Sequence, residues 1–219
     1  MVRTKLASEF IGTATLVAVV VGSGTMATNL SSDLGLALVI NTISTILALG
    51  ILIFLLGPLS GAHFNPAVTL SELYLKRISA SESLMYIASQ ILGGITGAMV
   101  ANLMFSNPAI YPSENIRCGS NLYLAEIIAT AGLMAIIIMA REQGKESFTP
   151  LLVASWIGSA YFFTSSTSFA NPAVTIARAF SDTFSGIAAQ SVPKFIASQL
   201  LGAAIGTLLA TYVLTTRRK

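Results

Sequence analysis

The pentapeptide Asn-Pro-Ala-Val-Thr occurs twice in this chain, as NPAVT at residues 65–69 and again at residues 171–175. Each copy opens an apolar stretch that is too short to cross a bilayer, "NPAVTLSELYL" (65–75) and "NPAVTIARAF" (171–180). Asn is a favourable N-cap, and Pro suits the first helical position, where its missing N–H would have no partner in any case. Each stretch is therefore predicted to be a half-helix that begins at its Asn.

The composition is that of an integral membrane protein. Hydrophobic residues fill 54% of the 219 positions, charged residues fill 10%, and the mean hydropathy is +0.77. A soluble domain carries about 25% charged residues. The one cysteine, Cys118, and the one histidine, His63, exclude a disulfide framework and a multi-residue Cys or His metal site. We expect no cofactor and no metal. The net charge of +3 does not indicate nucleic acid, because basic residues of membrane proteins mark the cytoplasmic side.

Six apolar runs have lengths near the ~20 residues that a membrane-spanning helix needs. They are residues 5–28, 34–57, 82–105, 121–140, 148–168 and 193–215. Strands of a membrane barrel would alternate apolar and polar residues instead, so an all-α fold is predicted. Six spans place both termini on one side of the membrane, and nine of the twelve basic residues then fall on that side, which predicts cytoplasmic termini. Glu9 and the length of the first run favour a retained span over a cleaved signal peptide.

The two halves of the chain match beyond the pentapeptide. "SEFIGT" (8–13) is similar to "AEIIAT" (125–130), and "ASQILGGITG" (88–97) is similar to "ASQLLGAAIG" (197–206). The second pair includes small residues at matching positions, Gly93 and Gly97 against Gly202 and Gly206. These glycines permit close helix approach. We expect them to pack within the subunit, against the half-helices.

Each half, about 1–110 and 118–219, consists of two spans, a half-helix and a third span. Because three spans end on the far side, the second half enters the membrane from the opposite face, which makes an inverted-topology repeat. The two half-helices then enter from opposite sides, and their N-termini meet near the midplane. We expect residues 1–219 to form one channel domain.

This arrangement predicts a pore between the half-helices. Irregular backbone at membrane depth is tolerated only where protein buries it or a water-filled cavity lines it. Two helix N-termini facing one cavity concentrate positive dipole there, and Asn65 and Asn171 can direct amide donors into the lumen. A neutral solute with oxygen atoms accepts such bonds, whereas a cation or excess proton meets a barrier. The alternative is that each Asn only caps its half-helix. Glu9 and Glu126 lie inside spans at equivalent positions and are predicted to bond to loop backbone.

The stretch "SGAHFNPAVTL" (60–70), the second "NPAVTIARAF" and the two ASQ(I/L)LG stretches resemble the aquaporin and aquaglyceroporin (major intrinsic protein) family. The resemblance runs from Glu9 to about Thr211. A third Asn-Pro-Ala, at 107–109, has neither a following half-helix nor a partner in the other half and is predicted to be a turn.

The resemblance implies a passive channel for water or small uncharged solutes, assembled as a homotetramer in the lipid bilayer with one pore per subunit. The short termini and compact loops favour the inner membrane of a bacterium, and no nucleic-acid partner is expected. The resemblance also places Asn65 and Asn171 at the pore centre. The half-helix ends would be stacked by Pro66, Ala67, Pro172 and Ala173. Glu9 and Glu126 correspond to buried glutamates that order the re-entrant loops. His63 is expected to make a loop-ordering hydrogen bond, with a gating role as the alternative.

The sequence departs from the family pattern at the outer constriction, where an arginine usually follows the second Asn-Pro-Ala directly. Val174 occupies that position here. Counting back from the two motifs places Thr45 and Ser159 at the other constriction positions, with Ser168 nearby. A constriction of these residues would be wide and would lack a fixed charge. It is expected to pass solutes larger than water, such as glycerol, urea or metalloid hydroxides such as arsenite. Ammonia is a further candidate substrate.

Arg178 lies four residues after Val174 and therefore on the same face of the half-helix. Two positions are open to its side chain. It can pair with Asp182 in an outer loop, which we favour because long side chains near helix ends tend toward water. Alternatively, it can reach back into the outer mouth as a displaced arginine.

Two other classes of function are alternatives to a channel. A coupled secondary transporter can also use inverted repeats and broken helices. Coupling needs titratable groups in the pathway, and only Glu9 and Glu126 qualify, for which a structural role is available. A membrane enzyme is not expected, because no nucleophile–base pair or metal-ligand cluster is found.

Overall fold

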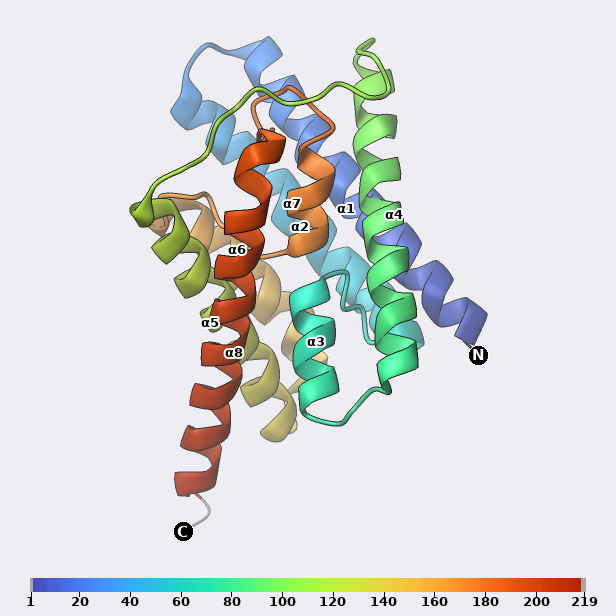
Figure 1. Ribbon diagram of the computed structural model, residues 1–219, viewed down its shortest axis with the longest axis vertical. Coiled ribbons are helices and arrows are strands. Elements are labelled where there is room, and N and C mark those ends of the chain that lie inside the picture. The colour runs from blue at the N-terminus through green and yellow to red at the C-terminus, as the bar shows by residue number, and fades with distance from the viewer. Residues whose placement is uncertain (1, 218–219) are drawn as a thin grey trace.

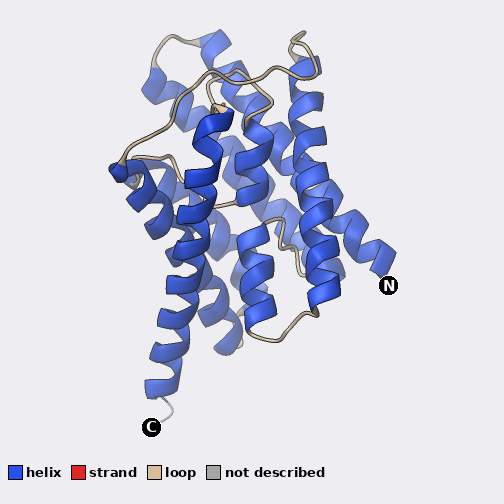
Figure 2. Ribbon diagram, viewed as in Figure 1, coloured by secondary structure: helices blue, strands red, loops and turns tan. Residues whose placement is uncertain are grey.

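The structure, a computed structural model, describes residues 2–217, and over that range it is helical with connecting loops (Figures 1 and 2). The α-helices are α1 (Val2–Leu30), α2 (Leu34–Ser60), α3 (Pro66–Tyr74), α4 (Ala80–Met104), α5 (Ser120–Glu142), α6 (Thr149–Phe163), α7 (Pro172–Arg178) and α8 (Val192–Arg217). Two short 3₁₀ turns, Glu146–Phe148 and Ala189–Ser191, precede α6 and α8. Among the described residues, one isolated bridge, between Tyr111 and Ser181, is the only β-pairing.

Five helices are long and apolar enough to cross a membrane: α1, α2, α4, α5 and α8. The fifth predicted span, 148–168, is shorter than expected. Helix α6 has 15 residues and ends at Phe163. The helix stops because Thr164 is extended, and the chain then runs as a loop to Asn171. Arg218 and Lys219 of the predicted basic tail lie outside the described residues.

The two halves of the chain are arranged alike, which is the inverted repeat predicted from the sequence. In the first half α1 packs against α2 and α4, and in the second half α5 packs against α6 and α8. The half-helices cross over to the other half, since α3 contacts α8 and α7 contacts α4. Figure 1 shows α3 and α7 stacked end to end between α4 and α8, with their N-termini meeting midway.

The paired glycines bring the third span of each half against the first. A Cβ atom on Gly97 would lie 2.1 Å from the carbonyl oxygen of Ala14 in α1, and one on Gly206 would lie 2.1 Å from that of Ala131 in α5. Packing within the subunit is therefore as predicted, but the expected partner, the half-helix, is wrong. The α7 half-helix instead meets Gly94, one residue away from the pattern, where a Cβ would lie 3.2 Å from Ala173 O.

Gly97→Ala is expected to destabilise the protein by about 1–3 kcal/mol, because the added methyl group meets a backbone oxygen and forces α1 and α4 apart. The measurement is thermal unfolding of the purified protein in detergent. Gly57→Ala in α2 is the control, since a Cβ there meets nothing within 4 Å. Removing a helical glycine at that site should leave the unfolding temperature unchanged or slightly raise it. Equal unfolding temperatures for the two variants would contradict the close-contact argument.

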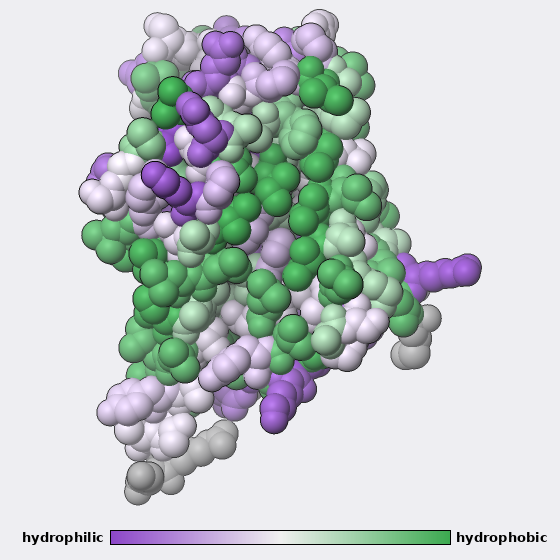
Figure 3. Space-filling model, viewed as in Figure 1, coloured by the Kyte–Doolittle hydropathy of each residue, from purple (hydrophilic) through white to green (hydrophobic). Residues whose placement is uncertain are grey.

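The outer surface carries a broad apolar belt between two polar ends, as Figure 3 shows. Large hydrophobic side chains are exposed along the spans, among them Leu47, Ile51 and Phe54 of α2 and Leu208 and Leu209 of α8. An apolar surface of this extent is unfavourable in water but is the surface that lipid tails contact. The protein is therefore a multi-pass membrane protein.

Candidate functional site

The two motif asparagines cap the two half-helices. The side-chain oxygen of Asn65 accepts a hydrogen bond from the backbone N–H of Ala67 at 2.9 Å, and that of Asn171 accepts one from Ala173 at 3.0 Å. Both asparagines have extended backbones, and a proline follows each at the first helical position. The capping geometry is thus the one that residue type and order favour at a helix start. Four residues were predicted to stack the half-helix ends, and all are buried at the starts of α3 and α7, namely Pro66, Ala67, Pro172 and Ala173.

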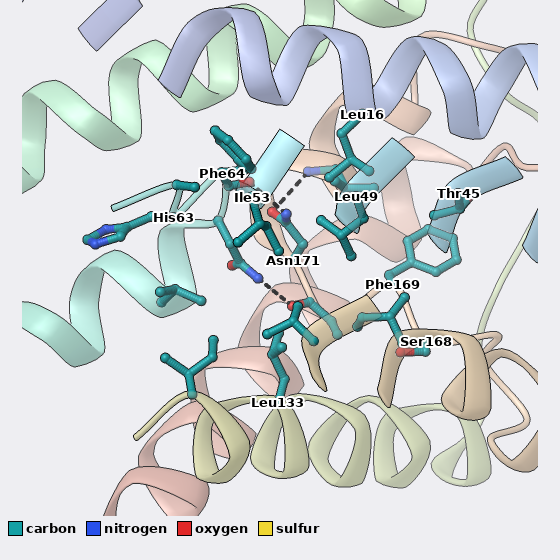
Figure 4. Close-up of a pocket in the computed structure, with 18 of the residues that line it drawn as sticks. Leu16, Thr45, Leu49, Ile53, His63, Phe64, Leu133, Ser168, Phe169 and Asn171 are labelled. Carbon is teal, nitrogen blue, oxygen red and sulfur yellow. Dashed lines mark hydrogen bonds between the residues drawn. The ribbon is translucent and has the colours of Figure 1, made fainter. Parts of the chain in front are cut away.

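The same asparagines also bond across the junction between the halves (Figure 4). Asn65 Nδ2 donates to the carbonyl oxygen of Ala170 at 2.7 Å, and Asn171 Nδ2 donates to that of Phe64 at 2.8 Å. Each half-helix is therefore attached to the loop that precedes the other one. An amide NH₂ group carries two hydrogens, so each asparagine retains one donor besides this cross-bond. Capping alone does not account for this arrangement.

Glu9 of α1 holds the loop before the first motif. Its carboxylate is fully buried and accepts hydrogen bonds from His63 N at 3.0 Å and Phe64 N at 2.7 Å. It also accepts bonds from Ser60 Oγ at 2.7 Å and from Gln90 Nε2 of α4 at 2.8 Å. The carboxylate therefore satisfies consecutive backbone N–H groups that have no helical partner.

Glu126 of α5 makes the equivalent set of contacts in the second half. It is also fully buried and accepts bonds from Phe169 N and Ala170 N, both at 2.9 Å, and from Gln199 Nε2 of α8 at 2.6 Å. In both halves the bonded N–H groups belong to the residues one and two positions before the motif Asn. The repeat therefore extends from the fold to individual hydrogen bonds.

The two loops share an unusual backbone conformation. Ala62 and Phe64 have φ of 49° and 47°, and Ser168 and Ala170 have φ of 51° and 47°. These residues lie three and one positions before each motif Asn. Non-glycine residues rarely adopt this left-handed region, at a cost of about 1–3 kcal/mol each. The hydrogen bonds to the buried glutamates offset this cost and hold the loops in place.

His63 belongs to the first loop and is half-buried. Its ring nitrogen Nδ1 lies 3.0 Å from Thr69 Oγ1, and its ring packs edge-on against Tyr86 at 5.2 Å between centroids. Thr69 Oγ1 also accepts a bond from Gln90 Nε2 at 3.0 Å. The histidine is thereby joined to the same hydrogen-bonded network that Glu9 organises.

Both motif asparagines, Asn65 and Asn171, line a cavity of about 160 Å³. Its wall is mainly apolar and includes Leu49, Ile53 and Leu133, with a small number of polar groups between them. Figure 4 shows Asn171 midway, with His63 toward one end and Thr45 and Ser168 toward the other. An apolar wall with a few convergent polar groups is typical of a site that accepts small molecules. Over residues 2–217, no cluster of three His, Cys, Asp or Glu side chains is placed to hold a metal ion.

Three of the residues predicted for the outer constriction line this cavity, namely Thr45, Ser168 and Val174, and each is buried. Ser159 does not line it and is exposed on the outer surface of α6. The prediction for Ser159 is therefore wrong. Tyr161 lines the cavity instead, and its hydroxyl lies 3.4 Å from Thr45 Oγ1.

The register differs because of where α6 ends. Val153, Ile157 and Tyr161 recur every four residues and form the face of α6 that lines the cavity. The predicted span extends to residue 168, whereas the helix ends at Phe163. The extended loop between them changes which α6 residue reaches the level of Thr45.

Arg178 also lines the cavity, and only 3% of it is exposed. Its guanidinium carbon lies 3.4 Å from the centroid of the Phe169 ring, and its Nε donates to the carbonyl oxygen of Ser185. Asp182 instead accepts a bond from Glu114 N at 3.0 Å. The favoured pairing of Arg178 with Asp182 is therefore wrong, and the side chain lies at the cavity.

Glu72 is a cavity-lining residue that the sequence analysis missed. It lies four residues after Val68, as Arg178 lies four residues after Val174, so the two charged residues are equivalents in the repeat. Extending the alignment one helical turn beyond the pentapeptide would have found it.

The carboxylate of Glu72 is paired with two arginines. Arg77 Nη1 lies 3.0 Å from one of its oxygens, and Arg141 Nη1 lies 3.0 Å from the other. Arg77 also bonds Glu142 at 2.6 Å, and Arg141 approaches Glu146 at 3.3 Å. This end of the cavity therefore holds charges that compensate one another.

Comparison with known proteins bears on this site. The family model described as Major intrinsic protein matches residues 2–169. The aquaglyceroporin AqpS of Rhizobium meliloti (strain 1021) is 45% identical over 211 residues, covering 96% of this chain and 90% of the relative. Aquaporin Z of Photorhabdus laumondii is 32% identical over 164 residues, covering 68% of this chain and 71% of the relative. The X-ray structure of the aquaglyceroporin from Plasmodium falciparum superimposes with a TM-score of 0.71 at 20% identity, covering 96% of this chain and 94% of that one.

Proposed function

The chain belongs to the major intrinsic protein family, and we propose that its cavity is the pore, with Asn65 and Asn171 at the centre. The protein is a passive channel for water and small solutes such as glycerol, and not an enzyme. One observation carries the assignment of the pore centre. The crossed amides of Asn65 and Asn171 bring two half-helix N-termini from opposite sides to one cavity.

We propose that a permeating molecule replaces some of its hydration at the two asparagines. Each amide has one hydrogen beyond its cross-bond to offer to an oxygen atom of the solute. The apolar wall on either side offers few other hydrogen-bond partners. Giving up hydration there therefore costs a neutral solute little free energy and costs a charged solute much. The dipoles of α3 and α7 add positive potential at the same level, which opposes cations and protons.

A passive pore fits the ionisable groups better than a coupled transporter does. Coupling needs a carboxylate that can bind and release an ion in the pathway. Glu9 and Glu126 are fully buried and hydrogen-bonded to the loops, and Glu72 is paired with two arginines. We propose that all three serve structure rather than coupling, and that His63 orders its loop rather than gates the pore.

We propose that the outer constriction admits solutes larger than water. Thr45, Ser168 and Val174 are small, and Tyr161 supplies one aromatic wall. The AqpS relative is by name an aquaglyceroporin, and this accords with an opening for glycerol-sized molecules. Urea and neutral metalloid hydroxides such as arsenite are of similar size and have oxygen atoms to accept the asparagine donors.

The test is stopped-flow light scattering of proteoliposomes that contain the purified protein. Glycerol, urea and arsenous acid are expected to enter faster than into protein-free liposomes, down their gradients and unaffected by an imposed ion or proton gradient. Accumulation against a gradient would instead establish a coupled transporter. Permeability to water alone would show that the constriction is narrow.

We propose that the termini are cytoplasmic and that the membrane is a bacterial inner membrane. Lys5 bonds Glu82 at 2.7 Å, and Arg77 bonds Glu142 at 2.6 Å. These pairs hold the N-terminal segment and the connections before α4 and after α5 at the same end of the molecule. Nine of the twelve basic residues belong to that end in the predicted topology, which fits the cytoplasmic side.

We also propose that residues 1–219 act as one channel domain with halves of about 1–110 and 118–219. The cross-bonded half-helices support this, because neither half closes the pore alone. Assembly as a homotetramer, with one pore per subunit and lipid around it, is proposed from family membership.

A further inference from the structure

Arg178 is the uncompensated charge of the cavity wall. The other charged side chains that line the cavity, Glu72 and Arg141, are paired with each other at 3.0 Å. No carboxylate of the described residues lies within ion-pair distance of Arg178. A buried charge without a partner is costly, so its presence at a pore calls for a physical explanation.

The Arg178 side chain is held in one orientation. Its guanidinium face lies on the ring of Phe169, 3.4 Å from the centroid, and its Nε is used by the carbonyl oxygen of Ser185. Within residues 2–217, its two terminal nitrogens have no protein acceptor. The fixed fork therefore has donors free for a molecule in the cavity.

A second polar group at this end of the cavity is also without a partner. The residue Ser168 lines the cavity, and its hydroxyl oxygen is buried and makes no hydrogen bond with the described residues. Ser168 directly precedes Phe169, on which Arg178 is stacked. The guanidinium fork offers donors to the oxygen atoms of a neutral solute, while its positive charge opposes a cation.

Arg117 is the other cation near Phe169, but it has a different role. Its guanidinium carbon lies 5.2 Å from the ring centroid, and its side chain bonds the carbonyl oxygens of Gly186 and Phe184 at 2.8 and 3.2 Å. It is not among the residues that line the cavity. Arg117 therefore fastens the outer loops, and Arg178 presents its charge to the pore.

We propose that Arg178 is the specificity-determining residue of the outer pore. Arg178 excludes cations and donates hydrogen bonds to neutral solutes that carry oxygen atoms. From one helical turn away, it supplies the positive charge that Val174 lacks. Pore width and selectivity against cations are then set by two different residues of the constriction. Val174 leaves the passage open to larger solutes, and Arg178 retains the selectivity against cations. The inference rests on the channel function proposed above.

The test compares urea with the guanidinium ion, which has nearly the same size and planar shape but carries a positive charge. Fluxes are measured in proteoliposomes for the original protein, Arg178→Gln, Arg178→Lys and Lys194→Gln. We expect the original protein to pass urea and exclude guanidinium. Arg178→Gln should raise the guanidinium flux on the order of tenfold or more while urea flux changes little. Arg178→Lys keeps the charge and should keep the exclusion.

Lys194→Gln is the matched control, because it removes one positive charge from the same end of the protein at an exposed site. Its guanidinium flux should stay at the original level. If Arg178→Gln does not reconstitute, Arg178→Met takes its place, since an unbranched apolar chain can still pack on Phe169. Guanidinium exclusion that survives loss of the Arg178 charge would overturn the proposal. An original protein that passes neither water, glycerol nor urea would instead overturn the channel function itself.

Discussion

Replacing Glu126 with Ala is expected to lower the free energy of unfolding by about 3–5 kcal/mol, because several buried donors lose their acceptor together. These donors are Phe169 N, Ala170 N and Gln199 Nε2. The loop then loses the bonds that hold Ser168 and Ala170 in the left-handed region. Ala170 carries the carbonyl oxygen that binds Asn65, so solute flux should be lost as well.

The measurements are thermal unfolding in detergent and stopped-flow glycerol flux in proteoliposomes. Glu114→Ala is the control, because that glutamate is exposed on the loop before α5 and is expected to change neither quantity. Normal stability and flux in Glu126→Ala would show that the carboxylate does not hold the loop.

Val174→Arg is expected to reduce glycerol flux on the order of tenfold or more and to reduce water flux less. Val174 is 5% exposed and lines the cavity near Thr45 and Tyr161, so a longer side chain at this position enters the passage. The new guanidinium would also lie one helical turn from Arg178, and the two like charges would repel each other. Water is small enough to pass the remaining space.

The measurement is the ratio of glycerol to water permeability in the same proteoliposomes. Val174→Leu separates size from charge, since it adds bulk alone and should lower glycerol flux by a smaller factor. An unchanged ratio in Val174→Arg would show that the constriction lies elsewhere along the cavity.

The features that the sequence predicted well are those with local or repeated signals. The half-helices were evident because Asn and Pro at a helix start act within one turn of the chain. The inverted arrangement followed from matching segments in the two halves and from an odd number of spans in each. Glu9 and Glu126 were selected because an ionisable residue inside a span needs a partner.

The outer constriction was harder to predict because its residues depend on where helices end and loops turn. Ser159 was selected by counting through a helix that stops at Phe163, and Tyr161 reaches the cavity in its place. Arg178 was expected to pair with Asp182, four residues further on, because a long side chain near a helix end tends toward water. Its real neighbours, Phe169 and Ser185, are brought to it by two separate loops, and sequence spacing does not report that approach.

The crossed asparagine bonds have a consequence for how the protein is made. Asn65 and its acceptor Ala170 are 105 residues apart in the chain. At a synthesis rate of roughly 5–20 residues per second, about 5–20 s pass between translation of the two. The first half therefore enters the membrane with its loop held only by groups of its own half, such as Glu9, and translation of the second half completes both cross-bonds at once. The pore is a late product of biosynthesis, formed when the last third of the polypeptide arrives.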